Sequence, residues 1–347
     1  MNCISETDLK YILSSTSKIL DEDFIKGSSI FITGATGFFG KWLLESFIYL
    51  NKELSLDVNI CALSRNPENF LQQFPFYKSE KCLTWIKGDI RTFEFPKEQF
   101  GYIIHAATDA DANLNAEHPL LMLDTITEGT RRILEFARKQ SEIKAFLLTS
   151  SGAVYGKQPE NITNIGETDS FYIDINNPVS AYAEGKRLSE LYCSIYAKQY
   201  NIPVKIARCF AFVGPYLPLD KHFAIGNFIR DGLNGQNITI IGDGSPLRSY
   251  MYAADLVIWL WALLLKGNSG EAYNVGSDKP ITIKELAMKV AGFFPGISVN
   301  ILNQIRTTDR IQNYIPDVSK FKKKFNFIED IELENAIQKT ISHYQKV

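Results

Sequence analysis

Apolar and polar positions alternate along the chain between short β-branched runs and longer runs with helical spacing. The first apolar run, 30–32, is followed by apolar positions at helical spacing over about 40–50. This pair predicts a buried strand and then a helix that packs on it. The pattern recurs, and we expect further strands at 58–63, 83–87, 102–105, 145–149 and 204–210, with long helices over about 117–140 and 180–200. Strands that alternate with helices predict a parallel sheet with right-handed crossovers and helices on both faces.

Three glycines follow the first predicted strand, in the segment Thr33-Gly-Ala-Thr-Gly-Phe-Phe-Gly40. One glycine permits a tight turn, one lets the backbone approach a pyrophosphate, and one lets the helix pack on the strand. The amides at the start of the helix would then face the phosphates. We therefore expect NAD or NADP to bind here; the alternative is a tight turn without a ligand. The residues assigned to this contact are Gly34, Thr36, Gly37, Phe38, Phe39 and Gly40.

The ends of the next strands indicate which dinucleotide is bound. NAD sites usually carry an acidic residue after the second strand, for the ribose 2′-hydroxyl, whereas this chain has Ser64 and Arg65. A hydroxyl and a guanidinium suit a 2′-phosphate better, so the pair favours NADP; Arg65 as a solvated loop charge is the alternative. Asp89, after the third strand, could accept from an adenine amino group. The other residues assigned to the dinucleotide are Ile90, Ala106, Ala107, Thr108, Thr149 and Cys209.

The pattern changes after residue 215, where the pieces become shorter and richer in glycine and proline, with helices expected near 282–293 and 332–345. The predicted fold class is α/β, a Rossmann-type doubly wound parallel sheet with a smaller C-terminal α/β substrate-binding lobe. An amphipathic helix is expected over 7–21, before the sheet. The expected domains are an N-terminal helical extension (1–27), a dinucleotide-binding domain (28–215, with a return segment at about 250–276) and a substrate-binding lobe (216–249 and 277–347).

Composition and charge exclude several classes of partner. With 45% hydrophobic and 22% charged residues the chain is typical of a soluble globular protein, and its net charge of −2 does not indicate binding to nucleic acid or to a membrane. Five cysteines without close pairing and no signal-peptide pattern lead us to expect a cytoplasmic protein, and we expect no bound metal. The most apolar run, 256–265, is too short to span a bilayer and is expected to be a core helix.

Candidate catalytic residues lie at the start of the helix predicted over 180–200. Tyr182 and Lys186 are four residues apart and share one helix face. An ammonium group near a tyrosine hydroxyl favours the phenolate, which can accept a proton. Ser151, at the end of the fifth strand, would lie near the same edge of the sheet. A tyrosine base, a lysine and a serine donor suit the removal of a proton from an alcohol whose carbon loses a hydride, although a tyrosine–lysine pair alone is common by chance.

With these motifs the chain resembles the extended short-chain dehydrogenase/reductases, in the nucleotide-sugar epimerase/dehydratase branch. The resemblance covers nearly the whole chain from residue 28 to the end. The sequence around Tyr182 is most similar to that of nucleotide-sugar decarboxylases and 4,6-dehydratases. The matching segments are the glycine-rich turn, His105-Ala-Ala107, Thr149-Ser-Ser-Gly-Ala-Val-Tyr-Gly156, Tyr182-Ala-Glu-Gly-Lys186, Ala207-Arg-Cys-Phe-Ala-Phe-Val-Gly-Pro215, Gly242-Asp-Gly-Ser-Pro-Leu-Arg-Ser-Tyr250 with Asp255, Tyr273-Asn-Val-Gly276 and Pro316-Asp317.

The resemblance implies a substrate and an assembly. The substrate would be a nucleoside-diphosphate sugar, with its diphosphate clamped by Arg248, whose guanidinium suits bidentate phosphate binding. The residues assigned to the substrate are Ser151, Gly152, Ala153, Asn227, Arg248 and Arg310. Members of the family pair the helices that correspond to 117–140 and 180–200 in a four-helix bundle, so we expect a homodimer. The apolar residues available for that bundle are Leu120, Leu121, Leu123, Ile133, Leu134, Leu188, Leu191 and Ile195.

Departures from the family pattern bear on the reaction. Gly152 and Ala153 stand where 4,6-dehydratases carry an acid and a base, and decarboxylases of the branch keep a glutamate where Ala153 stands. Glu184 is two residues past the tyrosine on the helix, so its side chain is expected to point away from the Tyr182/Lys186 face. Ile126 stands where the family commonly has an asparagine that supports a water chain. Elimination and decarboxylation each lose a usual partner, whereas redox chemistry keeps its residues.

The function we predict is nicotinamide-dependent redox at C4 of a nucleoside-diphosphate hexose, as a 4-epimerase or a 4-ketoreductase. The catalytic set is Ser151, Tyr182 and Lys186, and the last two also contact the dinucleotide. The alternatives are a nucleotide-sugar 4,6-dehydratase or a nucleotide-uronate decarboxylase. A sensor module that binds NAD(P) without catalysis is the non-enzyme alternative, but it has no need of the catalytic set.

Overall fold

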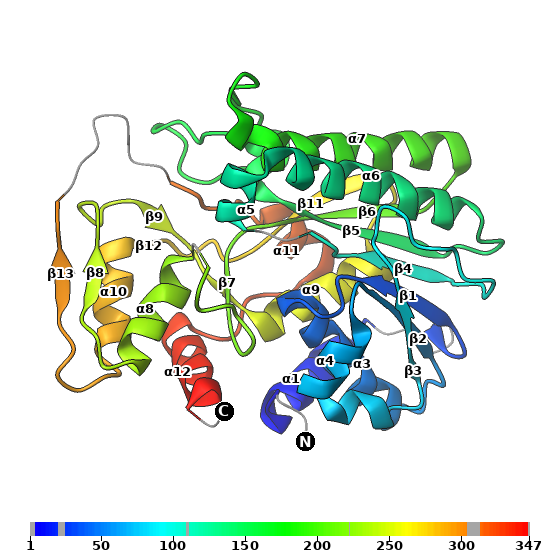
Figure 1. Ribbon diagram of the computed structural model, residues 1–347, viewed down its shortest axis with the longest axis horizontal. Coiled ribbons are helices and arrows are strands. Elements are labelled where there is room, and N and C mark those ends of the chain that lie inside the picture. The colour runs from blue at the N-terminus through cyan, green and yellow to red at the C-terminus, as the bar shows by residue number, and fades with distance from the viewer. Residues whose placement is uncertain (1–3, 20–24, 109–110, 222, 304–312, 346–347) are drawn as a thin grey trace. The chain divides into compact units, whose positions relative to one another are not determined.

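The computed structural model describes residues 4–19, 25–108, 111–221, 223–303 and 313–345 (Figure 1). The chain divides into two compact units. The first unit comprises Met1–Val154, Asp174–Arg208 and Val257–Ala272. The second unit comprises Tyr155–Ile173, Cys209–Leu256 and Tyr273–Val347.

A seven-stranded sheet organises the first unit. Its strand order is β11-β6-β5-β4-β1-β2-β3, and the pairs from β5 through β4, β1 and β2 to β3 are parallel. In the centre, Phe31 is paired with Cys61 on one side and with Ile103 on the other. The strands are β1 (Ser29–Thr33), β2 (Asn59–Ser64), β3 (Leu83–Lys87), β4 (Tyr102–His105), β5 (Ala145–Ser151), β6 (Val204–Cys209) and β11 (Glu271–Val275), in which the chain passes into the second unit. The predicted α/β class with a Rossmann-like parallel sheet is confirmed.

Helices cover both faces of this sheet. Helices α6 (Pro119–Arg138) and α7 (Ala181–Tyr200) lie side by side over one face (Figure 1). Their apolar sides join Phe31 and its strand neighbours in a core where the rings of Phe31 and Phe136 are 4.9 Å apart. Helix α3 (Phe38–Glu53) packs against α9 (Ala253–Lys266), with the rings of Phe47 and Trp261 4.9 Å apart. The strands whose ends carry the predicted site residues therefore belong to a sheet that apolar helix faces cover on both sides.

Shorter elements complete the first unit. Helix α1 (Glu6–Thr16) is capped by Ser5, whose hydroxyl oxygen accepts from the amide of Asp8, and it packs on α3. The others are α4 (Pro67–Gln73), α5 (Ala112–Glu117), and the single 3₁₀ turns η1 (Pro75–Ser79), η2 (Gly152–Tyr155) and η3 (Pro178–Ser180).

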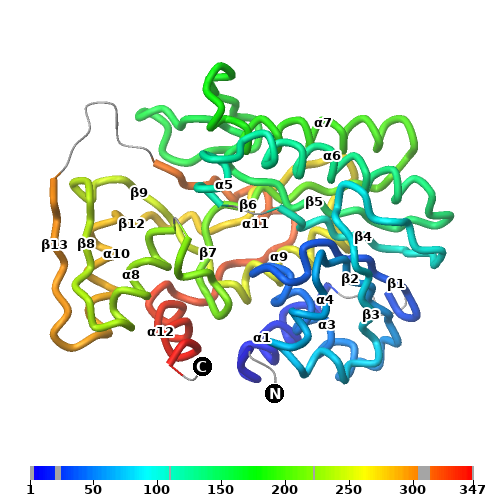
Figure 2. The backbone as a smooth tube through the Cα atoms, in the orientation of Figure 1, coloured from blue at the N-terminus to red at the C-terminus, as the bar shows by residue number. Residues whose placement is uncertain are grey.

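The described part of the second unit has small two-stranded sheets and short helices. Strands β8 (Ile238–Ile240) and β13 (Val299–Ile301) lie side by side in parallel, with α8 (Ala224–Leu233) and α10 (Ile283–Ala291) beside them (Figure 2). Helix α10 starts with a capping box between Thr282 and Glu285. The remaining elements are β7 (Phe212–Val213), β9 (Leu247–Arg248), β10 (Met251–Tyr252), β12 (Ile281–Thr282), α11 (Ser319–Phe325) and α12 (Leu333–Tyr344).

The structure corrects several expected boundaries. The helix expected over 7–21 ends at Thr16, with 20–24 outside the described residues. The helix expected over 117–140 is preceded by the separate α5, because Pro119 lacks an N–H and starts a new helix at its first position. Helix α4 and the seventh strand, β11, were not predicted. The apolar run 256–265 is a buried core helix, α9, as expected. Among the described residues, none of the helices is long and apolar enough to cross a bilayer.

Candidate functional site

The glycine-rich turn between β1 and α3 has the tight geometry that the sequence predicts. Gly34 has φ +73°, and a Cβ there would lie 2.3 Å from the carbonyl oxygen of Ala106. A Cβ on Gly40 would lie 2.3 Å from the carbonyl oxygen of Gly34. Helix α3 starts after Gly37 without a capping side chain, and its first turn has the amide arrangement that binds anions at helix N-termini. The turn therefore fits a pyrophosphate, and Thr36, Phe38 and Phe39 lie in the same segment.

A buried histidine links this turn to the next strand. His105 Nδ1 lies 2.8 Å from Thr33 Oγ1, and its Nε2 lies 3.2 Å from Thr130 Oγ1. The Thr33 oxygen accepts from the amides of Ala106 and Ala107, so its hydroxyl proton points to Nδ1 and the imidazole proton is on Nε2. Burial, with a smaller contribution from the Lys186 ammonium, lowers the pKa of His105 to about 3. The neutral imidazole orients the Thr33 hydroxyl, whose oxygen holds the amides of Ala106 and Ala107, the residues that the sequence assigns to the dinucleotide.

The strand ends assigned to the adenosine part lie beside each other. Asp89 receives three hydrogen bonds from Arg91: Nε and the backbone amide each donate to Oδ1 at 2.9 Å, and Nη2 donates to Oδ2 at 3.0 Å. This pairing, with a smaller effect of Arg65, lowers the pKa of Asp89. Arg65 is exposed, and the Ser64 hydroxyl accepts from the amide of Asn66. Ile90 is buried against Gly129 of α6, where it supports the loop by packing. The edge of the sheet therefore carries two guanidinium groups around one carboxylate.

Lys186 connects α7, the helix that carries Tyr182, to the ends of β4 and β5. Its Nζ donates to the Thr149 carbonyl at 2.9 Å and to Thr108 Oγ1 at 3.0 Å, and only 3% of the residue is exposed. The same nitrogen lies 5.9 Å from the centre of the Tyr182 ring. The Thr149 hydroxyl in turn donates to the carbonyl of His105 at 3.2 Å. Four residues predicted from sequence to meet at this edge are thus brought together in one unit.

Ser151 ends β5 and starts the turn that departs from the family pattern. Its hydroxyl oxygen accepts from the amide of Ala153 at 3.1 Å, which leaves the hydroxyl proton for another acceptor. Neither Gly152 nor Ala153 has an ionisable side chain. The nearby guanidinium of Arg187 donates from Nε to the Val154 carbonyl at 2.6 Å and pairs with Glu184 at 3.3 Å. The carboxylate two residues past Tyr182 is therefore engaged by Arg187.

Ile126 is fully buried where helices α6 and α7 meet. A Cβ on Gly185 would lie 3.2 Å from its side chain, so the glycine lets the two helices approach. Its carbonyl accepts from the hydroxyls of Thr130 and Ser189. The position is a packing contact between the helices.

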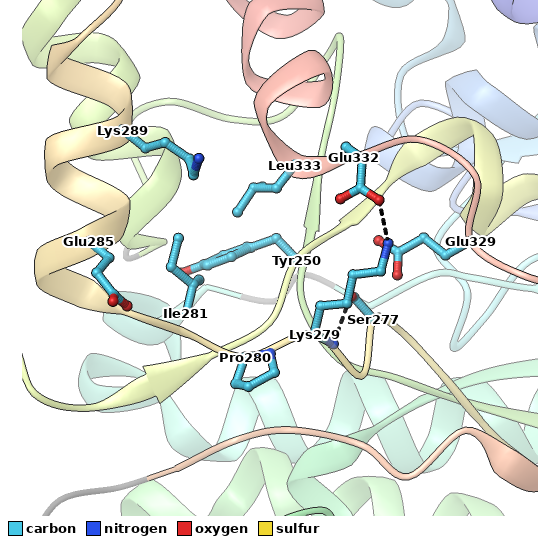
Figure 3. A pocket seen from close by; sticks show the side chains of 10 residues that line it. All are labelled: Tyr250, Ser277, Lys279, Pro280, Ile281, Glu285, Lys289, Glu329, Glu332 and Leu333. Carbon is cyan, nitrogen blue, oxygen red and sulfur yellow. Dashed lines mark hydrogen bonds and ion pairs between the residues drawn. The ribbon is translucent and has the colours of Figure 1, made fainter.

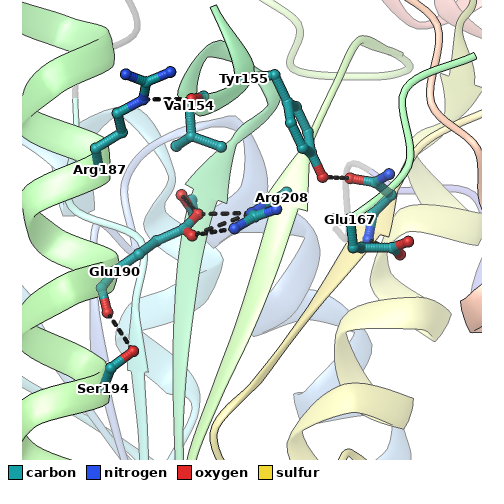
Figure 4. Close-up of polar contacts among 9 residues, drawn as sticks. Val154, Tyr155, Glu167, Arg187, Glu190, Ser194 and Arg208 are labelled. Carbon is teal, nitrogen blue, oxygen red and sulfur yellow. Dashed lines mark hydrogen bonds and ion pairs between the residues drawn. The ribbon is translucent and has the colours of Figure 1, made fainter. Parts of the chain in front are cut away.

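A partly buried polar cluster joins α7 to β5 and β6; Figure 4 shows Glu190 and Arg208 of this cluster. Glu190 of α7 pairs with Arg208 of β6, with 2.7 Å between Oε2 and Nη2 and side-chain exposures of 12% and 16%. The hydroxyl of Ser150, next to Ser151, donates to Glu190 Oε1 at 2.6 Å. One carboxylate thus ties α7 to β5 and β6. Neither this cluster nor Asn115, whose side chain contacts the backbone of Tyr182, could be predicted from the sequence pattern.

A second network, within the second unit, surrounds Asn274. Its Oδ1 accepts from the Tyr155 hydroxyl at 2.6 Å, its Nδ2 donates to the carbonyls of Ile165 and Asp317, and its amide donates to Glu167. Figure 4 labels Tyr155 and Glu167 of this network. Burial raises the pKa of the Glu167 carboxyl. The network joins three separate segments of that unit and has a structural role.

The residues assigned to the substrate in the second unit lie on two elements. Asn227 is on α8, and its Oδ1 accepts from Arg230 Nη1 at 3.2 Å. Arg248 is on β9, where burial lowers its pKa and Nη1 donates to the carbonyl of Leu247 at 2.9 Å. Cys209, which the sequence assigns to the dinucleotide rather than to the substrate, is buried at the end of β6. Arg310 lies outside the described residues.

The second unit also has an open hollow of about 360 Å³ that contains none of the predicted site residues (Figure 3). Its lining includes the apolar or aromatic side chains of Tyr250, Ile281 and Leu333. It also includes Lys279 and Glu332, which form an ion pair at 2.9 Å. Burial raises the pKa of Glu329 to about 7, and its Oε2 has no hydrogen-bond partner among the described residues. The described lining residues of the hollow include none of the candidate catalytic residues Ser151, Tyr182 and Lys186, which lie in the first unit. Among the described residues, no group of histidine, cysteine or acidic side chains could hold a metal ion.

Comparisons with known proteins agree with this geometry. The model of the NAD dependent epimerase/dehydratase family matches residues 30–276. A UDP-glucuronic acid decarboxylase 1 of Xenopus tropicalis is 28% identical over 321 residues, which cover 91% of this chain and 72% of that protein. A UDP-N-acetylglucosamine 4-epimerase structure from Methanobrevibacter ruminantium has a TM-score of 0.79 and 23% identity, with 92% of this chain and 99% of that chain covered. WbmF of Bordetella bronchiseptica in complex with NADH has a TM-score of 0.74 and 19% identity, with 93% of each chain covered.

Proposed function

Since the chain belongs to the NAD-dependent epimerase/dehydratase family, an enzyme family whose members modify nucleotide sugars, we propose that it catalyses redox at C4 of a nucleoside-diphosphate hexose. The observation that carries this proposal is the position of Lys186, which joins the Tyr182 helix to the ends of β4 and β5. The outcome would be inversion at C4 if the hydride returns to the opposite face of the same sugar, or reduction of a 4-keto sugar if reduced cofactor enters.

The residues of the chain have separate parts in this reaction. The Tyr182 oxygen takes the proton of the C4 hydroxyl, and the Lys186 ammonium stabilises the negative charge that the phenol carries. The Ser151 hydroxyl donates to the same sugar oxygen, because its own oxygen is oriented by the Ala153 amide. A bound nicotinamide supplies the hydride acceptor. The glycine turn, the uncapped start of α3 and the amides fixed by Thr33 would hold the dinucleotide.

The turn after Ser151 favours redox over elimination. Loss of water across C5–C6 needs a base at C5 and an acid at the C6 hydroxyl, both within hydrogen-bond reach. Gly152 and Ala153 supply neither, and Glu184 is engaged by Arg187. A 4-keto-6-deoxy product is therefore not expected at an enzymatic rate. A Gly152→Asp, Ala153→Glu double variant would be the gain-of-function control.

The second candidate is decarboxylation of a nucleotide uronate. It is favoured by the relatives named as UDP-glucuronic acid decarboxylases, which are 28% identical over nearly the whole chain. Decarboxylation also begins with oxidation at C4, so Tyr182, Lys186 and Ser151 would keep their parts. The absence of a carboxylate at Ala153 is the feature that places it second.

A substrate panel tests the choice. The purified protein is incubated with UDP-, dTDP-, CDP- and GDP-hexoses and with UDP-glucuronate, and products are read by NMR. We expect a C4-inverted hexose, or reduction of a 4-keto sugar with added reduced cofactor. A pentose product would favour the decarboxylase, and a 4-keto-6-deoxy sugar would show that another residue supplies acid and base. Cofactor that stays bound through purification would favour the epimerase over the reductase.

NADP is the dinucleotide we propose, because Arg65 and Arg91 lie at the strand ends assigned to the adenosine ribose. Arg65→Ala should weaken NADPH binding about tenfold, as expected for the loss of a charge-assisted phosphate contact, and leave NADH binding unchanged. Titration calorimetry of both nucleotides measures this. Equal losses for the two would contradict a 2′-phosphate contact.

A homodimer through α6 and α7 is the assembly we propose. Leu120, Leu191 and Ile195 are exposed by 70%, 55% and 37% on these helices, whereas Ile133 and Leu134 of the predicted set are buried in the sheet-facing core. Sedimentation at micromolar concentration should show a dimer for the parent and a monomer for Leu191→Glu. We propose the cytoplasm as its compartment, since the four cysteines that the structure describes form no disulfide.

A further inference from the structure

Helix α7, which carries Tyr182 and Lys186, begins without a capping side chain of its own. The hydroxyl of Ser180, the residue before the helix, donates to the carbonyl of Asp174 at 2.6 Å and does not cap. The amides of a first helical turn have no acceptor within the helix, and Tyr182 belongs to that turn. An acceptor for its amide therefore lies outside α7.

Asn115 of helix α5 supplies that acceptor. Its Oδ1 accepts from the Tyr182 amide at 3.1 Å, and its Nδ2 donates to the carbonyl of Val179 at 2.6 Å. The residue is only 8% exposed. A backbone amide can only donate and a carbonyl can only accept, so these contacts require a carboxamide in this orientation. One side chain therefore holds the backbone on both sides of the point where α7 starts.

The rest of α7 is fixed independently of Asn115. Lys186 is held by Thr149 and Thr108, and Glu190 is held by Ser150 and Arg208. If the contact to the first turn is lost, these residues keep their places while Tyr182 can move relative to Lys186. The position of the phenol therefore depends on Asn115 more than the position of the ammonium does.

We propose that Asn115 is a positioning residue that acts through the Tyr182 backbone and sets where the phenol lies relative to Lys186 and the sugar hydroxyl. The inference rests on the proposed function for the part that Tyr182 plays in proton transfer. A displacement of about 1 Å in a reacting group can lower turnover by up to roughly a hundredfold. Loss of Asn115 should therefore lower kcat, with little effect on binding of the dinucleotide.

The test compares Asn115→Leu with Asn113→Leu, a control at an exposed position of the same helix. We expect Asn115→Leu to lower kcat about ten- to a hundredfold, with unchanged KM and unchanged affinity for the dinucleotide measured by fluorescence. Hydrogen exchange at the Tyr182 amide should become faster. Asn115→Asp keeps the acceptor for that amide and loses the donor to Val179, so it should recover part of the lost kcat. The control should match the parent in every measurement.

The outcomes separate this inference from the function it rests on. An unchanged kcat in Asn115→Leu overturns it, and so does an equal loss of kcat in the Asn113→Leu control. If Asn115→Leu fails to fold, Asn115→Asp decides, and full activity together with unchanged exchange at Tyr182 then overturns the inference. If the parent converts no nucleotide sugar, the proposed function fails, while exchange at Tyr182 still reports whether Asn115 holds that amide. Unchanged exchange in that case overturns the inference as well.

Discussion

Two ion pairs, one in each unit, show how differently the chain uses its charges. Glu190 and Arg208 in the first unit have side-chain exposures of 12% and 16%, and their carboxylate also accepts from Ser150. Lys279 and Glu332 line the hollow in the second unit. Their side-chain exposures are 49% and 68%. Both pairs have good contact distances, so distance alone does not rank them. The two ion pairs differ instead in burial and in the number of further hydrogen bonds that their charged groups make.

The difference indicates where the chain is preorganised. In the first unit, polar side chains behind the strand ends are joined in connected networks, from Thr33 through His105 to Thr130 and from Ser150 through Glu190 to Arg208. A buried network with satisfied members holds a site in one geometry. Around the hollow of the second unit, Glu329 keeps a buried oxygen without a partner among the described residues. We therefore expect changes in the first unit to alter activity and stability more than changes around the hollow.

Tyr182→Phe should have the largest effect on activity. The change removes one hydroxyl and leaves the ring, so turnover should fall by roughly a hundredfold or more, the usual contribution of a positioned proton-transfer group. Dinucleotide binding should be unchanged, because Lys186 and the glycine turn remain. Steady-state kinetics and nucleotide titration measure the two quantities. Near-normal turnover would exclude the proposed part of Tyr182.

His105→Gln should change how stability depends on pH. The unfolded histidine protonates near its ordinary pKa of 6.5, whereas the folded one stays neutral down to about 3. The unfolded state binds more protons in this window, so the contribution to stability is complete above pH 6.5 and is lost as pH falls, by about 1.4 kcal/mol per pH unit. Urea unfolding measured at several pH values across this range gives the free energy of unfolding as a function of pH. This free energy should fall less steeply with decreasing pH in His105→Gln than in the parent. The exposed His118, changed to Gln, is the control, and equal slopes in parent and His105→Gln would contradict the prediction.

Glu190→Ala should lower the free energy of unfolding by about 3 kcal/mol, because it leaves a largely buried guanidinium without its carboxylate. Denaturant unfolding near neutral pH measures the loss. The matched change in the second unit is Glu332→Ala, which removes the carboxylate of an exposed pair and should cost no more than about 0.5 kcal/mol. Similar losses in the two variants would show that burial does not separate the pairs.

The strands, the glycine turn and the Tyr182/Lys186 pair could be predicted from sequence because each depends on local spacing. A period of two or three to four residues, or three glycines after a strand, is a property of neighbouring positions. Residues 256–265 were expected as a core helix for the same reason, and the structure has them in α9.

The networks could not be predicted because their members are far apart in the chain. Glu190 meets Arg208 and Ser150 across two strands, and Asn115 reaches Tyr182 from α5, a short helix that the pattern did not predict. Ile133 and Leu134 were expected at a dimer surface, but apolar side chains at helical spacing do not indicate which partner covers them, and both face the sheet. Long-range pairing of polar side chains leaves no periodic signal in a single sequence.

Transfer of the hydrogen at C4 is the step that the whole account depends on. The measurement uses a nucleoside-diphosphate hexose deuterated at C4, selected by the substrate panel, in unlabelled water. For an epimerase we predict a primary deuterium isotope effect on turnover, deuterium at C4 of the inverted product, and no hydrogen taken up from water at C5. A 4-keto sugar has no hydrogen at C4, so for a reductase the label is placed on the reduced nicotinamide and is expected at C4 of the alcohol product. Tyr182→Phe should slow this transfer to the same extent as turnover. A product that keeps its C4 hydrogen untouched throughout, or that carries solvent hydrogen at C5, would contradict redox at C4 as the reaction of this protein.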